Sequence, residues 1–413
     1  MAPHDLSPHW LAELYGRVRA RTEALAAPLS AEDQTVQSMA DASPTKWHRA
    51  HTTWFFETFL LVPHLPGYRP FDPAYAYLFN SYYEAVGPRH PRPARGVISR
   101  PGIAEIAAYR AHVDQAMEQL LATPDPRLTD LLLLGLNHEQ QHQELLLTDI
   151  KHAFSASVLA PVYLPAESVP PAAGLPPHRW VDVAGGVHRI GHDERGFAFD
   201  NETPAHDALL PAFRIADRPV SNGEFLRFIE EDGYRRPEFW LSDGWATVQA
   251  QQWEAPGYWL RDGAEWSVYT LNGLCRVRPD EPVCHVSYYE AAAYAEWAGA
   301  RLPTEFEWEA AARLSDAAAD VPAAIQTHPR PLREGFVQDV WEWTASAYAP
   351  YPGFRPLKGA LGEYNGKFMI NQMVLRGRSC ATPPGHERLS YRNFFPPQAR
   401  WQFSGFRLAT GEE

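Results

Sequence analysis

The stretch HEQQHQE, residues 138–144, lies inside a leucine-rich segment without proline, LLLLGLNHEQQHQELLLTDIKH, at residues 131–152. This pattern predicts a long buried helix over about residues 130–154. Because His138 and His142 are four residues apart, their imidazoles leave the same face of that helix, one turn apart. Two stacked imidazoles on an apolar stripe are a candidate pair of metal ligands. The structural alternative is two core histidines whose ring nitrogens are satisfied by backbone or water.

Length and composition restrict the class of protein. A chain of 413 residues is too long for one ordinary core, so two domains are expected. A net charge of −13 argues against nucleic acid or an anionic membrane surface as partner. The three cysteines form no CxxC motif, which argues against a disulfide framework or a cysteine zinc site. The N-terminus lacks an apolar signal core and no run approaches a membrane span, so we expect a cytoplasmic protein.

The first third of the chain has helical patterns. Ser43 followed by Pro44 predicts a helix start, and Pro63 predicts its stop. A loop rich in proline and arginine follows, at about residues 68–101. Four helices with one long crossover loop predict a four-helix bundle whose metal ligands face the core, within residues 1–155. The segments expected to be helical are 6–29, 41–65, 103–122 and 130–154.

The rest of the chain has a different texture. Residues 156–177 are rich in proline and alanine and are predicted to be a linker. Residues 178–413 contain short mixed segments, which predict an α+β domain with little regular structure. Within it we expect a hairpin at 180–191 with its turn at Gly185-Gly186, helices at 222–231 and 288–299, and an irregular connection at 241–263.

HEQQH also satisfies the zinc-protease pattern H-E-x-x-H, in which Glu139 would be the general base. That interpretation needs a third ligand downstream. The position ten residues after His138 is Thr148, and His152 lies about one helical turn too far along the same helix. The zinc-protease pattern therefore stands without its third ligand.

A better third ligand lies upstream, in KWHRAHTTWFFETF. His48 and His51 are three residues apart and share a helix face, and the spacing alone does not decide which of them joins His138 and His142. Three neutral imidazoles leave up to three open positions in an octahedron, which favours a redox metal that binds O₂ and substrates, as in non-haem Fe(II) sites. A structural zinc would instead be closed by four ligands.

Several motifs resemble a known family. WHRAHTTWFFETFLL, FNSYYEAVGPRHPRPARGVISRP and NHEQQHQELLLTDIKH resemble the DinB-like domain of the sulfoxide synthases of ergothioneine biosynthesis. VSYYEAAAYAEWAGARLPTEFEWEAAAR, VWEWTAS, EYNGKFMINQMVLRG, YRNFFPP and SGFRLA resemble the formylglycine-generating-enzyme-like domain, of C-type-lectin type, that follows in the same proteins. The resemblance covers nearly the whole chain in collinear order, and it implies a four-helix bundle followed by this α+β domain.

The resemblance implies roles for particular residues. The iron ligands would be His51, His138 and His142, with Fe(II) as cofactor. Family members bind hercynine, a histidine betaine, and the residues matching its contacts are Gln141 and Asn393, the latter followed by Phe394 and Phe395. A matching tyrosine pair that would manage protons near the reacting oxygen is Tyr82 and Tyr83. The structural alternatives are that Gln141 supports a histidine ligand and that the tyrosines pack a loop.

The second substrate would be held by cationic groups. Arginine forks suit carboxylates, and Arg89 or Arg92 is expected to reach the donor, whereas Arg95 and Arg100 are expected to pair with acidic surface residues. Relatives that use γ-glutamylcysteine have an aspartate where this chain has Phe395. The resemblance therefore implies a smaller thiol donor such as cysteine.

Two departures from the family pattern qualify that reading. Where relatives have GNVWEW this chain has QDVWEW from Gln338 and Asp339, and where they have LRGGS it has LRGRS, with Arg378 in place of glycine. Arg378 would narrow the pocket or contact the second substrate, or else lie in a surface loop. The departures keep the related selenoneine synthases, which join a selenosugar selenium to hercynine, as an alternative. Cys275 and Cys284 do not fall in the copper-binding motif of formylglycine-generating enzymes, so copper is not carried over.

The sequence therefore predicts an O₂-dependent enzyme with non-haem Fe(II) that forms a carbon–sulfur bond, or a carbon–selenium bond, at imidazole C2 of hercynine. Its partners would be small molecules, namely hercynine, a thiol or selenol donor and O₂. Two alternatives come from other classes. One is a zinc hydrolase or thiol transferase on the bundle, and the other is a binding protein with a lectin-type domain and a structural metal.

Overall fold

The computed structural model describes residues 8–123, 125–165, 174–175, 178–193, 195–263, 265–315, 321–333 and 335–411. The chain divides into two compact units. Unit 1 comprises Met1–Leu159 with the short segments Arg195–Phe197 and Pro356–Tyr364, and unit 2 comprises Ala160–Glu194, Ala198–Arg355 and Asn365–Glu413. Both short segments of unit 1 come from stretches that the sequence assigned to the second domain. Much of the predicted linker, residues 166–173 and 176–177, lies outside the described residues.

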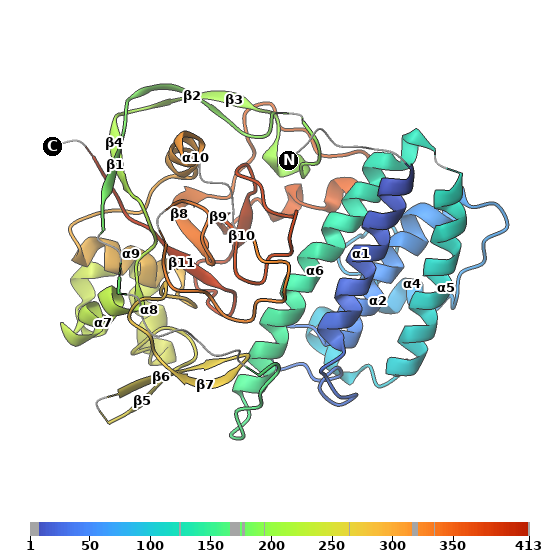
Figure 1. The fold of residues 1–413 in the computed structure, drawn as a ribbon, viewed down its shortest axis with the longest axis horizontal. Helices are drawn as coiled ribbons and strands as arrows, with labels where there is room; N and C mark the ends of the chain where they lie inside the picture. The colour runs from blue at the N-terminus through green and yellow to red at the C-terminus, as the bar shows by residue number, and fades with distance from the viewer. Residues whose placement is uncertain are drawn as a thin grey trace. The chain divides into compact units, whose positions relative to one another are not determined.

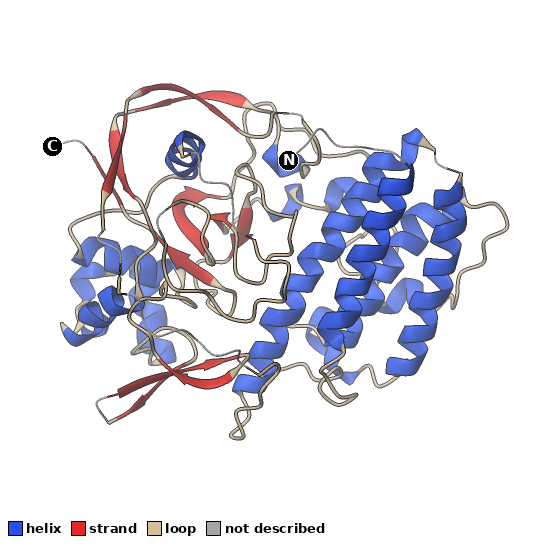
Figure 2. Ribbon diagram, in the orientation of Figure 1, coloured by secondary structure: helices blue, strands red, loops and turns tan. Residues whose placement is uncertain are grey.

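Unit 1 is built from the four predicted long helices, which lie side by side (Figures 1 and 2). The helices α1 and α2 each pack against both α5 and α6. Every residue of α2 is buried, polar ones included, so this helix carries its histidines inside the bundle. The bounds are α1 Pro8–Ala26, α2 Thr45–Phe56, α5 Ile103–Ala122 and α6 Thr129–Ser155.

The second helix does not end at Phe56 but continues through a π-helical turn, Glu57–Leu61, and the short α3, Val62–His64. The buried carboxylate of Glu57 accepts hydrogen bonds from the hydroxyls of Tyr68 (2.6 Å) and Tyr109 (2.7 Å). These bonds tie the crossover loop and α5 to this turn. The loop itself contains α4, Tyr75–Leu78, and the 3₁₀ helix Arg92–Val97.

Unit 2 has several small sheets, with order β10-β9-β8-β11 in the largest, where β11 runs parallel to β8. Its strands are β8 Trp341–Ala347, β9 Met373–Gly377, β10 Asn393–Phe395 and β11 Ser404–Phe406. A three-stranded sheet has the order β1-β4-β12, from Trp180–Val183, Phe213–Ala216 and Ala409–Gly411. The others are β2-β3, from Gly186–Ile190 and His206–Leu210, and β5-β6-β7, from Trp259–Asp262, Glu265–Thr270 and Gly273–Arg276. The helices are α7 Asn222–Glu230, α8 Ser242–Gln251, α9 Tyr288–Trp297 and α10 Glu305–Leu314.

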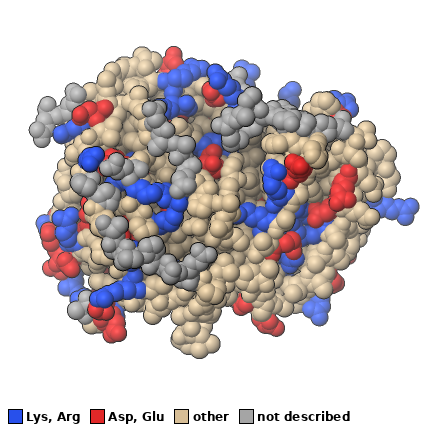
Figure 3. Space-filling model, in the orientation of Figure 1, with Lys and Arg blue, Asp and Glu red and all other residues tan. Residues whose placement is uncertain are grey.

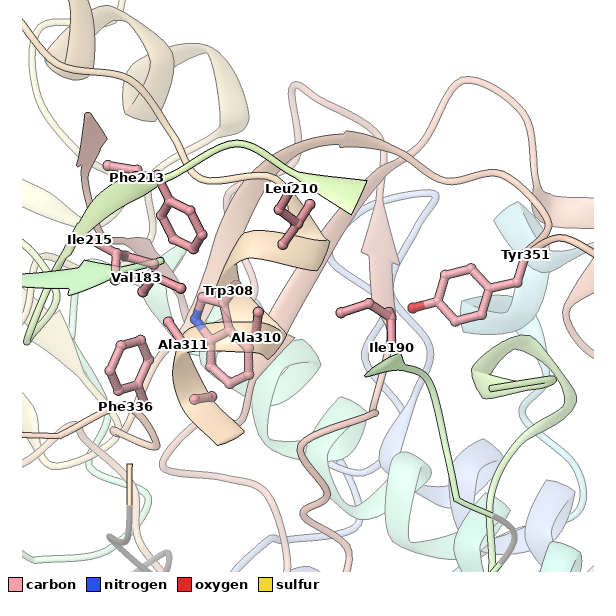
Figure 4. Close-up of a cluster of buried hydrophobic side chains, with 12 residues drawn as sticks. Val183, Ile190, Leu210, Phe213, Ile215, Trp308, Ala310, Ala311, Phe336 and Tyr351 are labelled. Atoms are coloured by element: carbon pink, nitrogen blue, oxygen red, sulfur yellow. The ribbon is translucent and has the colours of Figure 1, made fainter. Parts of the chain in front are cut away.

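A hydrophobic core lies between α10 and the strands around it (Figure 4). Trp308 of α10 is fully buried, and its indole N–H donates to Oε2 of Glu342 on β8 at 2.8 Å. Phe213 and Ile215 of β4 and Val183 of β1 contribute to the same core. A tryptophan whose one donor is satisfied can be buried without a desolvation penalty, so it anchors the helix to the sheet.

Two sequence expectations for unit 2 were wrong. Residues 180–191 do not form a hairpin, because β1 pairs with β4 and β2 pairs with β3. Residues 241–263 are not irregular throughout, since they contain α8 and β5. Gly244 lowers the helix propensity of α8, but a side chain there would meet Tyr289 at 3.0 Å, so tertiary packing of α8 on α9 explains that glycine. The predicted helices at α7 and α9 are confirmed.

Among the described residues, no helix is long and apolar enough to cross a membrane. On the face shown in Figure 3, basic and acidic side chains are interspersed. A cytoplasmic location stays a prediction.

Candidate metal centre

His51 of α2 and His138 and His142 of α6 come together inside the bundle. One ring nitrogen of each lies within 4.8 Å of the corresponding nitrogens of the other two. His51 and His138 are fully buried, and their Nε2 atoms are 3.1 Å apart. The described part of the chain contains no other group of three or more histidine, cysteine, aspartate or glutamate side chains placed to hold a metal.

His51 is held in one orientation by its surroundings. Its Nδ1 lies 2.6 Å from the carbonyl oxygen of Phe79, which can only accept, so Nδ1 carries the proton and Nε2 has the lone pair. The ring is stacked between Trp47 (centroids 4.6 Å apart) and Trp54 (5.6 Å). The direction of the lone pair on Nε2 of His51 is therefore fixed by the protein itself, in the absence of a bound metal.

The three imidazoles are neutral in this environment. Burial lowers the pKa of His138 to about 3. Burial, followed by the charge that a protonated His138 would carry, also lowers the pKa values of His51 and His142 well below the usual histidine range. Neutral imidazole is the form that binds metal, so these residues fit a divalent transition metal supplied with three nitrogen donors.

His48 is not part of this cluster, although its spacing allowed it. Its Nδ1 lies 2.8 Å from Nδ1 of His142, and its Nε2 lies 2.9 Å from Oδ2 of Asp149. His152 also lies apart from the cluster, with Nδ1 2.7 Å from Oγ of Ser38. The structure thus brings together the set that the family resemblance implied.

Glu139 is not placed as a general base. Its side chain is fully buried, and its carboxylate accepts from Arg19 (2.9 Å), Thr22 (2.6 Å) and Arg110 (3.1 Å). Burial opposes ionisation, yet Arg19 and Arg110 hold the pKa of Glu139 below its usual range. A carboxylate committed to two buried guanidiniums serves the packing of α1, α5 and α6.

Tyr83 of the predicted tyrosine pair is connected to the cluster through Trp54, which stacks on His51, and the two tyrosines lie in different environments. Tyr83 is fully buried against Trp54 and Phe59, and burial raises its pKa well above the usual range. Tyr82 is half-buried and stacks on Tyr83, with centroids 4.7 Å apart. The ring of Tyr82 also lies near that of Tyr364, with centroids 6.2 Å apart.

Tyr364 is a site residue that sequence reasoning missed. Its hydroxyl donates to Oε1 of Gln141, and its ring lies 5.7 Å from that of His138. The neighbouring Glu363 accepts from the backbone N–H groups of Glu84 (3.1 Å) and Ala85 (2.8 Å), which fastens this segment to the crossover loop. The available signal was the EYNG motif of the family resemblance, because nothing in the local pattern indicates this long-range contact.

The arginines of the crossover loop differ from the expectation. Arg89 is exposed and pairs with Glu84 at 2.8 Å, and Arg92 donates to the carbonyl of Asp41. Arg95, expected on the surface, is buried, with its guanidinium 3.3 Å from the centroid of Trp47. Trp47 in turn stacks on His51, so Arg95 packs against the side chain that holds the His51 ring in place. Contact of Arg89 or Arg92 with a substrate stays a prediction.

The remaining predicted residues belong to unit 2. Asn393, Phe394 and Phe395 form β10, and Phe394 stacks on Tyr348 with centroids 4.1 Å apart. Their contact with a substrate also stays a prediction.

Arg378 does not lie in a surface loop, as one alternative had it. Its side chain is fully buried, with Nη2 2.6 Å from Oδ1 of Asp339. Asp339 also pairs with Arg330, at 2.7 Å. The two positions that depart from the family pattern therefore contact each other, because the carboxylate of Asp339 forms a buried ion pair with Arg378. This engagement favours a structural role for Arg378 over contact with a substrate.

Known proteins match both units. Residues 14–146 match the DinB superfamily, and residues 166–330 and 334–411 match the sulfatase-modifying factor enzyme 1-like domain. A hercynine oxygenase of Mycolicibacterium smegmatis is 34% identical over 404 residues, which cover 89% of this chain and 91% of that protein. The chain belongs to the hercynine oxygenase family. It is therefore an enzyme of the oxidoreductase class.

Two further relatives fit this assignment to the hercynine oxygenase family. The hercynine oxygenase of Mycobacterium tuberculosis is 34% identical over 439 residues, covering 98% of this chain and 99% of that protein. A formylglycine-generating enzyme of Thermomonospora curvata is 36% identical over 204 residues, covering 45% of this chain and 67% of that protein. The resemblance stated from the motifs is confirmed at the level of the family and its two domains.

Proposed function

We propose that this chain is a non-haem Fe(II), O₂-dependent enzyme that joins a small thiol such as cysteine to imidazole C2 of hercynine and leaves a sulfoxide. The observation that carries the proposal is the convergence of His51, His138 and His142, in a chain whose relatives are named hercynine oxygenases. The reaction balances as hercynine plus thiol plus O₂ giving the sulfoxide and water. The C2 and thiol hydrogens leave in the water, and O₂ accepts four electrons.

The donor set supports iron better than a structural zinc. Three neutral imidazoles supply no charge and no fourth ligand, whereas structural zinc is usually closed by four ligands, often with thiolates. Fe(II) held here would supply the one-electron chemistry that O₂ requires and would leave positions for substrates. The three cysteines all lie outside the histidine cluster, in unit 2.

Gln141 and Tyr364 support the placement of hercynine. Gln141 leaves α6 one residue before His142, and the hydroxyl of Tyr364 donates to its Oε1. An amide oxygen has two acceptor sites, so Oε1 of Gln141 can accept from Tyr364 and also from the N–H of the hercynine imidazole. Tyr364 would thus orient the amide that orients the substrate.

The tyrosines would move a proton. Tyr83 stays a phenol at any physiological pH, because burial raises its pKa. Tyr82 is the partly exposed member of the pair and contacts both Tyr83 and Tyr364. We assign to Tyr82 or Tyr83 the donation of a proton to the oxygen as it is reduced.

The thiol donor is proposed from one substitution. A family aspartate associated with γ-glutamylcysteine is replaced by Phe395, which offers no hydrogen-bonding group to a γ-glutamyl extension. Arg89 or Arg92 would meet the carboxylate of a smaller donor. Joining of a selenosugar selenol remains the alternative, and competition between donors decides between them.

The test is a competition experiment with protein purified without oxygen and loaded with Fe(II). Hercynine, O₂ and equal amounts of cysteine, γ-glutamylcysteine and a selenosugar selenol are added together, and products are identified by mass spectrometry. The proposal predicts the cysteine–hercynine sulfoxide as the main product. A main product containing selenium, or a γ-glutamyl sulfoxide, would overturn the donor assignment. No product from any donor would overturn the reaction assignment.

Two controls separate the other classes of function. Stoichiometric zinc in the active protein, with no activity restored by Fe(II), would indicate the hydrolase or transferase alternative. His138→Ala should abolish turnover while leaving the melting temperature of unit 2 unchanged. A binding protein with a structural metal would instead bind its ligand as before after this substitution.

A further inference from the structure

His48 contacts two groups of different chemistry. Its Nε2 lies 2.9 Å from Oδ2 of Asp149, and its Nδ1 lies 2.8 Å from Nδ1 of His142. His48 is 3% exposed and Asp149 is 5% exposed, so bulk water is not an alternative partner for either. Asp149 and His142 both belong to α6, and His48 belongs to α2, which packs against it.

The direction of each hydrogen bond follows from Asp149. Its Oδ2 also lies 2.8 Å from the backbone nitrogen of Ser43, which can only donate. This oxygen is therefore an acceptor, and Nε2 of His48 carries the proton that it accepts. With its single ring proton on Nε2, the imidazole of His48 presents a lone pair at Nδ1.

That lone pair decides the tautomer of His142. Only a protonated Nδ1 of His142 can donate to Nδ1 of His48, and this leaves the lone pair of His142 on Nε2. The opposite direction would place the proton of His142 on Nε2, where it would block metal binding. His142 thus has a different arrangement from His51, whose tautomer is set directly by the carbonyl of Phe79.

We infer that Asp149 and His48 are positioning residues that act in series to hold His142 in its Nδ1–H tautomer and so direct its Nε2 toward the metal. The inference rests on the proposed function only in taking the three-histidine cluster as a metal site. In many metal sites a carboxylate accepts directly from the ligand histidine, whereas here a second histidine stands between them. The tautomer can be observed in the absence of metal, hercynine and O₂.

The first measurement needs no variant other than one for assignment. The metal-free full chain, labelled with ¹⁵N-histidine, is examined by long-range ¹H–¹⁵N correlation, and the signals of His142 are identified by their loss in His142→Gln. The inference predicts that Nδ1 of His142 carries the proton. Protonation on Nε2 of His142 overturns it, whatever the metal affinity.

The second measurement separates hydrogen bonding from packing. The metal-free protein is titrated with Co(II), followed by visible absorption. His48→Leu should weaken Co(II) binding by about 10–100-fold, whereas His48→Asn, whose carbonyl can accept from His142, should bind within a factor of about three of wild type. His152→Leu, a matched substitution on α6 outside the cluster, should bind as wild type.

The two His48 variants decide between the roles. If His48 only fills space, leucine should serve at least as well as asparagine, because its volume is closer to that of the native packing. Equal Co(II) affinities of His48→Leu and His48→Asn would therefore overturn the inference. Loss of turnover with normal Co(II) affinity would leave the inference wrong and the proposed function unaffected.

Discussion

Oε2 of Glu139 lies 2.9 Å from Nη1 of Arg19, and this pair joins α6, which carries His138 and His142, to α1 inside the bundle. Arg110 of α5 approaches the other carboxylate oxygen at 3.1 Å. Glu139 follows His138 directly in the chain. His138 belongs to the histidine cluster, whereas Glu139 forms ion pairs that join α6 to α1 and α5. The H-E-x-x-H pattern is accordingly satisfied without the chemistry of a zinc protease.

Glu139→Ala should therefore lower the stability of unit 1. Removing the carboxylate takes away the fully buried partner that Arg19 and Arg110 share and leaves them the partly exposed carboxylates of Asp114 and Glu23. Breaking a buried pair in this way costs up to about 3–5 kcal/mol. The measurement is the free energy of urea unfolding, with Glu118→Ala on α5 as a control. A general base would show the opposite result, namely loss of activity with an unchanged free energy of unfolding.

Tyr364→Phe should weaken hercynine binding through Gln141. The substitution removes the hydroxyl that donates to Oε1 of Gln141, and one such hydrogen bond contributes about 0.5–1.5 kcal/mol, or roughly 2–13-fold in affinity. Calorimetric titration of metal-loaded protein with hercynine, without O₂, measures this effect. Gln141→Ala should show a loss at least as large, and the double variant should be no weaker than Gln141→Ala alone. Additive losses would show that Tyr364 does not act through Gln141.

The buried pair of Asp339 and Arg378 should show strong coupling. Asp339→Asn leaves the guanidinium of Arg378 buried without its carboxylate and should destabilise unit 2 more than Arg378→Gly, after which Asp339 keeps its pair with Arg330. The double variant restores the residues that relatives have at both positions, so it should recover about 0.5–3 kcal/mol of the summed loss. Urea unfolding of the four proteins of this cycle gives the coupling. Strict additivity would contradict the paired role.

His386 gives unit 2 a dependence on pH. It is fully buried, and burial, together with the positive charge of Arg388, lowers its pKa well below the usual range. Below the unfolded-state pKa, near 6.5, the unfolded chain binds a proton that the folded chain refuses, so stability falls as pH decreases. His386→Gln should make this slope shallower by up to about 1.4 kcal/mol per pH unit. Unfolding of both proteins between pH 7.5 and pH 5 tests it, and parallel slopes would contradict it.

The helical bundle was accessible to sequence reasoning because its signals are local. Spacing put His138 and His142 on one face, and Ser43-Pro44 marked where α2 begins. The choice of His51 over His48 was not local, since it depends on how α2 is rotated against α6, and only the family resemblance supplied it.

Other parts of the site depend on contacts that no local pattern encodes. Tyr364 and Gln141 are 223 residues apart, and Asp339 and Arg378 are 39 apart. The same reason explains why the predicted hairpin at residues 180–191 was wrong. Gly185-Gly186 matched a local turn pattern, but β1 pairs with β4, which is distant in sequence. The carboxylate of Asp149 was overlooked because it lies two turns beyond His142, and its role appears only through His48.

The three-histidine cluster is proposed to support O₂-dependent substitution at C2 of hercynine. The most direct test of this proposal uses hercynine carrying deuterium at C2, with Fe(II)-loaded protein, cysteine and O₂, and mass spectrometry of the product. Wild type should form a sulfoxide that has lost the deuterium, whereas His138→Ala should form none, and unreacted hercynine should keep its label. A product that retains the deuterium, or no O₂-dependent product at all, would contradict the proposed function.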